Sequence, residues 1–230
     1  MTPPAAESPA AILDCPLLAP ELSDEAVVAG IQAAKRLGIA SVTVRPCDID
    51  LAVRSLEAST VIPAAACGYP HGSQNTATKL YEARDLLRRG AKEIVAVIGI
   101  SRLLSREFQH VQTELLQLAE SCHRESAKLT VILEAGYLTN ELKVIACACC
   151  ERAEVDRVMP SAAGWRAEDL QLLRKHLPEE VGLQAAGAET LEQVLELQGL
   201  GCARISTAAP AAILQSWQAR QAAAPGTANS

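Results

Sequence analysis

Residues 129–150, LTVILEAGYLTNELKVIACACC, contain the pattern that decides the fold. The run Leu129–Glu134 is short, apolar and rich in β-branched residues, which is typical of a buried strand. Thr139, Asn140 and Glu141 then open a segment in which apolar residues recur at helical spacing, and such residues commonly begin a helix. The stretch therefore predicts one strand followed by one helix.

The same strand-then-helix unit recurs about eight times along the 230 residues. Such alternation builds right-handed units with a parallel sheet, and eight units in one chain of this length favour a closed barrel. Neither G-x-G-x-x-G nor G-x-x-x-x-G-K-[ST] occurs. These motifs are the main sequence signatures of nucleotide-binding folds with an open sheet, so their absence disfavours such a fold. We predict an α/β fold, a single (β/α)8 TIM barrel. Its predicted strands are Ala11–Asp14, Ser41–Arg45, Val61–Cys67, Glu93–Ile98, Leu129–Glu134, Val155–Met159, Val181–Ala185 and Ala203–Ser206.

No linker or change of composition divides the chain, so residues 10–221 are predicted to form one domain. Residues 1–9 and 222–230 are biased toward small residues and proline, which predicts a disordered lead and tail. The first residues have neither the basic start nor the apolar core of a signal peptide, and no run approaches the roughly 18 apolar residues of a membrane span. We therefore expect a cytoplasmic protein without a membrane partner.

The charge and the cysteine content argue against nucleic-acid-binding proteins and metal proteins. The net charge of −6 and the sequence pI near 5.3 argue against a nucleic-acid partner, which would favour a basic stripe. Cys147, Cys149 and Cys150 form a C-x-C-C cluster that is compatible with a metal or redox site, or with small buried helix residues. Structural metal sites have a different cysteine spacing and a second ligand pair, so we predict no metal site and no cofactor.

Five segments form a recognisable set: Asp14 with Leu17-Leu18, Ala65–Gly72 (AACGYPHG), Val131–Glu134 (VILE), Leu138–Glu141 (LTNE) and Arg204–Thr207 (RIST). Together these segments resemble the deoxyribose-phosphate aldolase family, over about residues 12–221. The resemblance implies a reversible cleavage of 2-deoxyribose 5-phosphate to acetaldehyde and glyceraldehyde 3-phosphate, through a Schiff base on a lysine late in the sixth strand. It also implies a homodimer.

The residues to which this resemblance assigns the chemistry have been replaced. The Schiff-base lysine falls on Met159 or Pro160, a second lysine falls on Gln184, and a carboxylate of the fourth strand falls on Val95. None of the six lysines falls at the C-terminal end of a predicted strand, where the chemistry of such barrels lies. We therefore expect that imine catalysis is absent.

Other candidate residues have both a functional and a structural interpretation. Asp14 contacts a ligand or caps a turn after the first strand. Glu134, at the end of the fifth strand, is a general base or only a hydrogen-bond acceptor. His71 contacts a ligand or is a polar loop residue. Lys79 and Glu82 lie three residues apart on a predicted helix, which indicates a surface pair.

A phosphate site is expected in the loops after the last strands, where backbone N–H groups can face an anion. Gly164, Gly187, Ser206 and Thr207 occupy those places. Residues other than glycine restrict the backbone there, so the site is predicted to be weakened.

These observations lead to the prediction of a catalytically inactive, aldolase-like barrel. It would act as a binding, regulatory or assembly protein, with a small phosphorylated metabolite and an unidentified protein as partners. The alternative is an active deoxyribose-phosphate aldolase, or another lyase or isomerase that acts on a small phosphorylated sugar.

Overall fold

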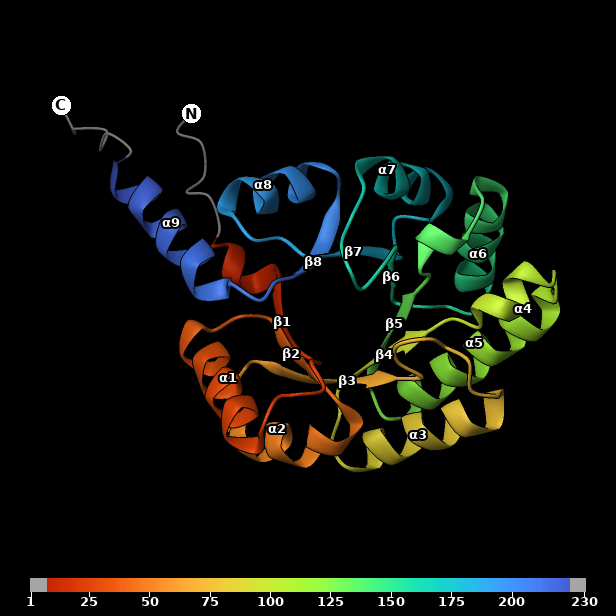
Figure 1. Cartoon of the computed structure of the whole chain (residues 1–230), viewed down its shortest axis with the longest axis horizontal. Coiled ribbons are helices and arrows are strands. Elements are labelled where there is room, and N and C mark those ends of the chain that lie inside the picture. Colours follow the sequence, from red (N-terminus) through yellow and green to blue (C-terminus); the bar gives the residue numbers. More distant parts are fainter. Residues whose placement is uncertain (1–7, 224–230) are drawn as a thin grey trace.

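The computed structural model describes residues 8–223, and within them eight parallel strands close into one ring, β1 to β8 in chain order. Figure 1 shows the strands at the centre and the helices around them. The ring closes where β1 pairs with β8, with Asp14 opposite Ser206. The prediction of a single (β/α)8 barrel is confirmed. Most of the predicted lead and tail lie outside the described residues.

Seven of the eight strands begin and end within two residues of their predicted bounds. The first differs: the structure has a 3₁₀ helix, η1, over Pro9–Ile12, and the strand follows it. Pro16 lies in this strand, and proline is unusual within a strand because it has no N–H to donate. The strands are β1 Leu13–Leu17, β2 Ser41–Val44, β3 Ile62–Cys67, β4 Glu93–Val97, β5 Lys128–Ile132, β6 Arg157–Met159, β7 Gly182–Ala186 and β8 Cys202–Ser206.

Side-chain caps mark where helices begin, and α6 begins where the sequence indicated. The Ser23 hydroxyl accepts a hydrogen bond from Ala26 N at the start of α1, and Thr139 does the same for Leu142 N at the start of α6. Gly38 ends α1 with φ +61°, a conformation that favours glycine. The helices are α1 Asp24–Leu37, α2 Ile49–Ser55, α3 Thr76–Arg88, α4 Ile100–Leu104, α5 Phe108–Arg124, α6 Asn140–Arg152, α7 Ala167–His176, α8 Leu191–Gly199 and α9 Pro210–Ala223, with short 3₁₀ helices η2 Pro46–Asp48 and η3 Ala135–Tyr137.

The barrel interior is layered. A large apolar core fills the space between strands and helices, and a smaller apolar cluster that includes Val95, Ile132 and Met159 lies within the ring. At the N-terminal end of the strands the interior is charged instead, where Arg157 forms an ion pair with Glu93. Buried charges of this kind are tolerated because they are paired. The charged layer closes the ring at one end and leaves the other end for a site.

The prediction that Lys79 and Glu82 form a surface pair is wrong. Lys79 is fully buried, and its Nζ lies 2.7 Å from Glu114 Oε1, because α3 turns this side chain toward α5.

The cysteine cluster in α6 is buried, and burial raises the pKa of Cys147 to about 12. Within residues 8–223 no group of three or more His, Cys, Asp or Glu side chains could hold a metal ion.

No helix of the described part is long and apolar enough to cross a membrane. The cytoplasmic location and the homodimer stay predictions.

Candidate active site

A small cavity of about 30 Å³ opens inside the ring, toward the C-terminal ends of the strands. A water molecule needs roughly 10–15 Å³, so the cavity holds about two groups of that size. One side, which we call the polar wall, consists of Asp14, Thr43, Gln184 and Ser206. The opposite side, the apolar wall, consists of Val95, Ile132, Met159 and Ala186. The cavity lies where barrel enzymes of this architecture carry their chemistry.

Asp14 is the central residue of the polar wall. It lies within β1 and not after it, so its buried side chain points into the ring and does not cap a turn. Its Oδ1 accepts hydrogen bonds from the hydroxyls of Ser41 at 2.7 Å and Thr43 at 2.8 Å, and its Oδ2 accepts one from Ser206 at 2.8 Å. Burial raises the pKa of Asp14, and the nearby Glu93 charge raises it further, against the lowering effect of the three hydroxyls.

Gln184 extends the polar wall from β7. Its Nε2 donates to Ser206 Oγ at 3.0 Å, while Oε1 is buried and has no hydrogen-bond partner among the described residues. Buried polar atoms are almost always hydrogen-bonded, so this oxygen is an acceptor for a ligand or for water. The second N–H of the same amide remains available as a donor.

The positions at which the resemblance placed catalytic side chains form much of the cavity. Val95 and Met159 lie in the apolar wall, and Gln184 lies in the polar wall. Pro160 follows β6, and its carbonyl oxygen accepts a hydrogen bond from Ala135 N. None of the residues that line the cavity is a lysine. The lysines lie elsewhere: Lys35 in α1, Lys79 in α3, Lys92 before β4, Lys128 at the start of β5, Lys143 in α6 and Lys175 in α7.

Glu134 and His71 lie outside the cavity, in a neighbouring cleft of about 200 Å³. Glu134 has φ +50°, and its carboxylate accepts hydrogen bonds from Ser161 Oγ at 2.9 Å and Ala162 N at 3.1 Å. It therefore holds the loop after β6 in place. Ala162 borders both the cavity and the cleft.

Three of the four residues expected to bind phosphate have hydrogen-bond partners within the protein, and the fourth, Gly164, lies close to Gly187. Gly187 N donates to Ser206 O, and a Cβ on Gly187 would come within 3.3 Å of the Gly164 backbone. Ser206 donates to Asp14, and Thr207 Oγ1 accepts from Ala209 N. The loop after β6 thus packs over Gly187, where an anion would approach.

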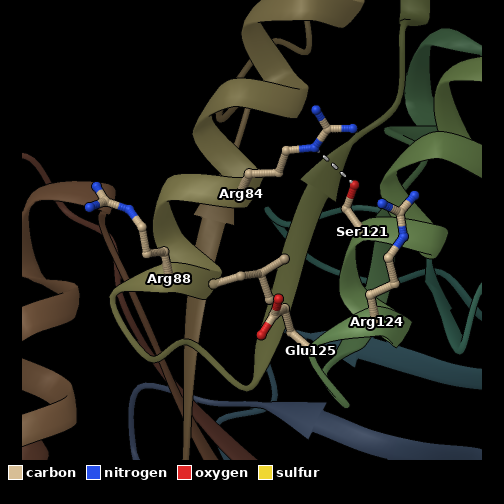
Figure 2. Close-up of a pocket in the computed structure, with 6 residues that line it drawn as sticks. Arg84, Arg88, Ser121, Arg124 and Glu125 are labelled. Carbon is tan, nitrogen blue, oxygen red and sulfur yellow. Dashed lines mark hydrogen bonds between the residues drawn. The ribbon is translucent and has the colours of Figure 1, made fainter.

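Positive charge collects at a different place. Arg84, Arg88 and Arg124 line a hollow of about 380 Å³ between α3 and α5, and Figure 2 shows Arg84 and Arg124 on either side of Ser121. Arg88 and Arg124 are near the C-terminal ends of these helices. In a barrel of this kind the C-terminal ends of the helices lie at the end opposite the cavity, so this hollow is remote from the cavity.

Thr43 is a polar residue of the cavity that was not among the candidates from the sequence. A signal for it exists: Ser41 and Thr43 alternate with valines in a buried strand, and alternate residues of a strand face the same side.

Comparisons with known proteins agree on one family. A sequence profile of the DeoC/LacD family aldolases matches residues 13–149, more than half of the chain. The deoxyribose-phosphate aldolase of Treponema denticola is 31% identical over 207 residues, covering 88% of this chain and 96% of that protein. The deoxyribose-phosphate aldolase of Rhodopirellula baltica is 34% identical over 213 residues, covering 88% and 86%.

Solved structures give the same result. An aldolase named QR15 superposes with a TM-score of 0.84 at 27% identity, covering 91% of this chain and 95% of that one. The tetrameric deoxyribose phosphate aldolase of Aeropyrum pernix shares the fold, with a TM-score of 0.81 at 22% identity, covering 92% and 91%.

These relatives overturn the prediction of a catalytically inactive barrel. That prediction rests on a few positions, chiefly Val95, Met159 and Gln184, whereas similarity to proteins named as aldolases extends over 207 residues. The active alternative agrees better with this similarity. The chain belongs to the DeoC/LacD family of aldolases.

Proposed function

We propose that this protein is an active carbon–carbon lyase, which cleaves or forms a β-hydroxy carbonyl compound in the cavity without an imine. Asp14 supports this proposal most strongly: it is a buried carboxylate with a raised pKa, and it borders a small cavity that can hold the reacting atoms of a substrate. A carboxyl group whose pKa is shifted toward neutrality is suited to transfer protons in both directions. Membership of an aldolase family supports the reaction class.

In the cleavage direction, the Asp14 carboxylate takes the proton from the substrate hydroxyl. The carbon–carbon bond next to that carbon breaks, the hydroxyl carbon becomes an aldehyde, and the electron pair moves to the remaining carbonyl as an enolate. The free N–H of Gln184 donates to the enolate oxygen. Asp14 then returns its proton to the enolate carbon, which gives the second carbonyl product and restores the carboxylate.

The apolar wall contributes by excluding water. Val95, Ile132 and Met159 are buried, and none of them can donate or accept a proton. Electrostatic interactions of Asp14 and Gln184 with the reacting atoms are stronger in such surroundings. Because no lysine lines the cavity, we propose that proton transfer replaces covalent catalysis.

The test is a cleavage assay on the purified full chain with a panel of β-hydroxy carbonyl compounds, including 2-deoxyribose 5-phosphate and 2-deoxyribose. Aldehyde release is followed with a coupled dehydrogenase, and borohydride is added in a parallel reaction. We expect aldehyde release and no borohydride-stable adduct on any lysine, with an imine-forming aldolase trapped alongside as control. Failure to cleave any member of the panel would refute the lyase, and an adduct on one lysine would refute the mechanism without an imine.

A further inference from the structure

The strands carry a small set of buried charges. Of the described residues of the eight strands, the charged side chains that are buried are Asp14 on β1, Glu93 on β4, Arg157 on β6 and Arg204 on β8. When all four are ionised their charges cancel, and when Asp14 binds a proton one positive charge is left over. Buried charges are costly unless an opposite charge compensates them. The balance of charge inside the ring therefore favours the ionised form of Asp14.

Two of these four residues pair directly with each other. Arg157 forms an ion pair with Glu93. Thr130 Oγ1 donates to Glu93 Oε1 at 2.8 Å and accepts from Arg157 Nε at 3.3 Å, so both oxygens of the Glu93 carboxylate have a partner. Arg204 differs: it forms no direct ion pair with a carboxylate of the described residues, and its buried Nε has no hydrogen-bond partner among them. Asp14 is therefore the carboxylate that remains to compensate the charge of Arg204.

The Ser41 hydroxyl joins Arg204 to Asp14. Arg204 Nη1 donates to Ser41 Oγ at 2.9 Å, and Ser41 Oγ donates to Asp14 Oδ1 at 2.7 Å. A guanidinium can only donate, so it makes the Ser41 oxygen an acceptor and leaves the single hydroxyl proton for Asp14. Thr43 Oγ1 also donates to Asp14 Oδ1, at 2.8 Å, but no arginine of the described strands donates to Thr43. The Ser41 hydroxyl is thus the one through which a positive charge acts on Asp14.

The pKa shifts of these groups agree with their geometry. Burial lowers the pKa of Arg204, and the charge of Glu93 raises it. The charge of Arg157 lowers the same pKa, and the charge of Asp14 raises it. The attraction between Arg204 and Asp14 acts on both groups, so it favours the carboxylate form of Asp14 and opposes the burial that raises the Asp14 pKa. The remaining titratable neighbour is Cys15 on β1, whose pKa burial raises to about 12, so it is neutral near pH 7.

We propose that Arg204 is a positioning residue, which holds the Ser41 hydroxyl toward Asp14 and supplies the positive charge that keeps the Asp14 carboxylate ionised for proton transfer. This inference rests on the proposed lyase function, in which Asp14 takes the proton from the substrate hydroxyl. Arg204 does not line the cavity, so it acts on Asp14 and not on the substrate. Its loss should therefore lower kcat and leave KM nearly unchanged.

The test compares variants that separate the charge of Arg204 from its other contacts. Arg204→Met removes the charge and keeps an apolar side chain. Arg204→Lys, the conservative variant, keeps a positive charge. Arg204→Gln removes the charge and keeps an N–H donor, and it replaces Arg204→Met if that variant does not fold. Arg174→Met is the matched control: Arg174 is a half-buried arginine of α7 that donates to backbone carbonyls of the loop before β7, so its loss removes hydrogen bonds without changing the charge inside the ring.

The first measurement is the pH dependence of kcat, with the panel compound that the unchanged protein cleaves fastest. We expect Arg204→Met to move the acidic limb of the profile to higher pH by about one unit or more. The rate should then fall roughly tenfold on the acidic side of the limb and recover above it. Arg204→Lys should move the limb less, and Arg174→Met should leave it in place. A loss of rate that is equal at every pH, or an unmoved limb in a folded variant, would overturn the inference and leave the lyase function standing.

The second measurement follows the ionisation of Asp14 without catalysis, by NMR of the full chain with isotope-labelled aspartate carboxyl groups. Asp14→Asn identifies the Asp14 signal. We expect its titration midpoint to lie about one pH unit or more higher in Arg204→Met than in the unchanged protein, and to be unmoved in Arg174→Met. If no compound of the panel is cleaved, the lyase function fails and this midpoint alone decides whether Arg204 acts on Asp14. A shift supports that action, and an unchanged midpoint overturns it.

Discussion

The two walls of the cavity differ in every respect that matters for chemistry. In the polar wall, formed by β1, β2, β7 and β8, Asp14, Thr43, Gln184 and Ser206 are joined by hydrogen bonds. In the apolar wall, β4 to β7 contribute only aliphatic or thioether side chains. The groups that can transfer protons are therefore concentrated in the polar wall, whereas the side chains of the apolar wall pack against a ligand and exclude water.

Asp14→Asn tests the polar wall at its centre and should have the largest effect. An amide cannot accept the substrate's proton, so we expect kcat/KM for cleavage to fall roughly 10²- to 10⁴-fold. The measurement is the cleavage assay, with near-UV circular dichroism to verify that the variant is folded. A folded variant that retains more than about a tenth of the activity would show that Asp14 is not the acid–base group.

Met159→Lys tests the apolar wall by adding a charge among apolar side chains. Met159 is 4% exposed, so the buried ammonium should cost up to roughly 3–5 kcal/mol of unfolding free energy at neutral pH, and pairing with Asp14 across the cavity would lower this cost. Burial lowers the pKa of such a lysine, so the loss should be smaller at high pH. Urea unfolding at pH 7 and pH 10 measures the loss of unfolding free energy and its dependence on pH. Met159→Leu, which keeps the volume, is the control and should cost less than about 1.5 kcal/mol.

Ser206→Ala removes one hydroxyl that donates to Asp14 and accepts from Gln184. Leaving these buried groups unsatisfied should cost roughly 1–3 kcal/mol of unfolding free energy. The Ser206 hydrogen bond lowers the pKa of Asp14, so its loss should move the acidic limb of the pH–rate profile to higher pH. Ser105→Ala, at an exposed position after α4, should leave the profile in place. If the acidic limb of the pH–rate profile does not move in Ser206→Ala, ionisation of Asp14 does not control the rate.

The pH dependence of stability gives the smallest effect. Because the pKa of Asp14 is raised in the folded protein, the folded state binds more protons than the unfolded chain from about pH 4 up to that raised pKa. Stability contributed by Asp14 should therefore fall as the pH rises through this window, by at most about 1.4 kcal/mol per pH unit. Asp14→Asn should lack this slope, and identical slopes in urea-unfolding series of both proteins would contradict the raised pKa.

Much of the fold is predictable because it depends on local patterns. Alternating apolar runs and capped helices placed seven strands within two residues of their observed bounds. Glu134 shows the limit: its sequence position beside the fifth strand was correct, but only the structure shows that it holds Ser161 and Ala162. A pattern along the chain does not specify which loop a side chain will contact.

The site was less predictable because its contacts span the chain. Asp14 and Ser206 are 192 residues apart, so no spacing motif relates them. Lys79 was assigned to the surface because helical spacing alone does not tell which neighbouring helix covers a face, and Glu114 on α5 buries it. Thr43 could have been found from its alternation with Ser41, which points both hydroxyls into the ring.

The pairing of β1 with β8 has a consequence for the order in which this protein becomes functional. Asp14 is synthesised 192 residues before its partner Ser206. Since chains are made from the N-terminus, the surroundings of this carboxylate do not exist until the eighth strand has been made. Activity would therefore appear only when the ring has closed, and a chain that stops before β8 would be inactive.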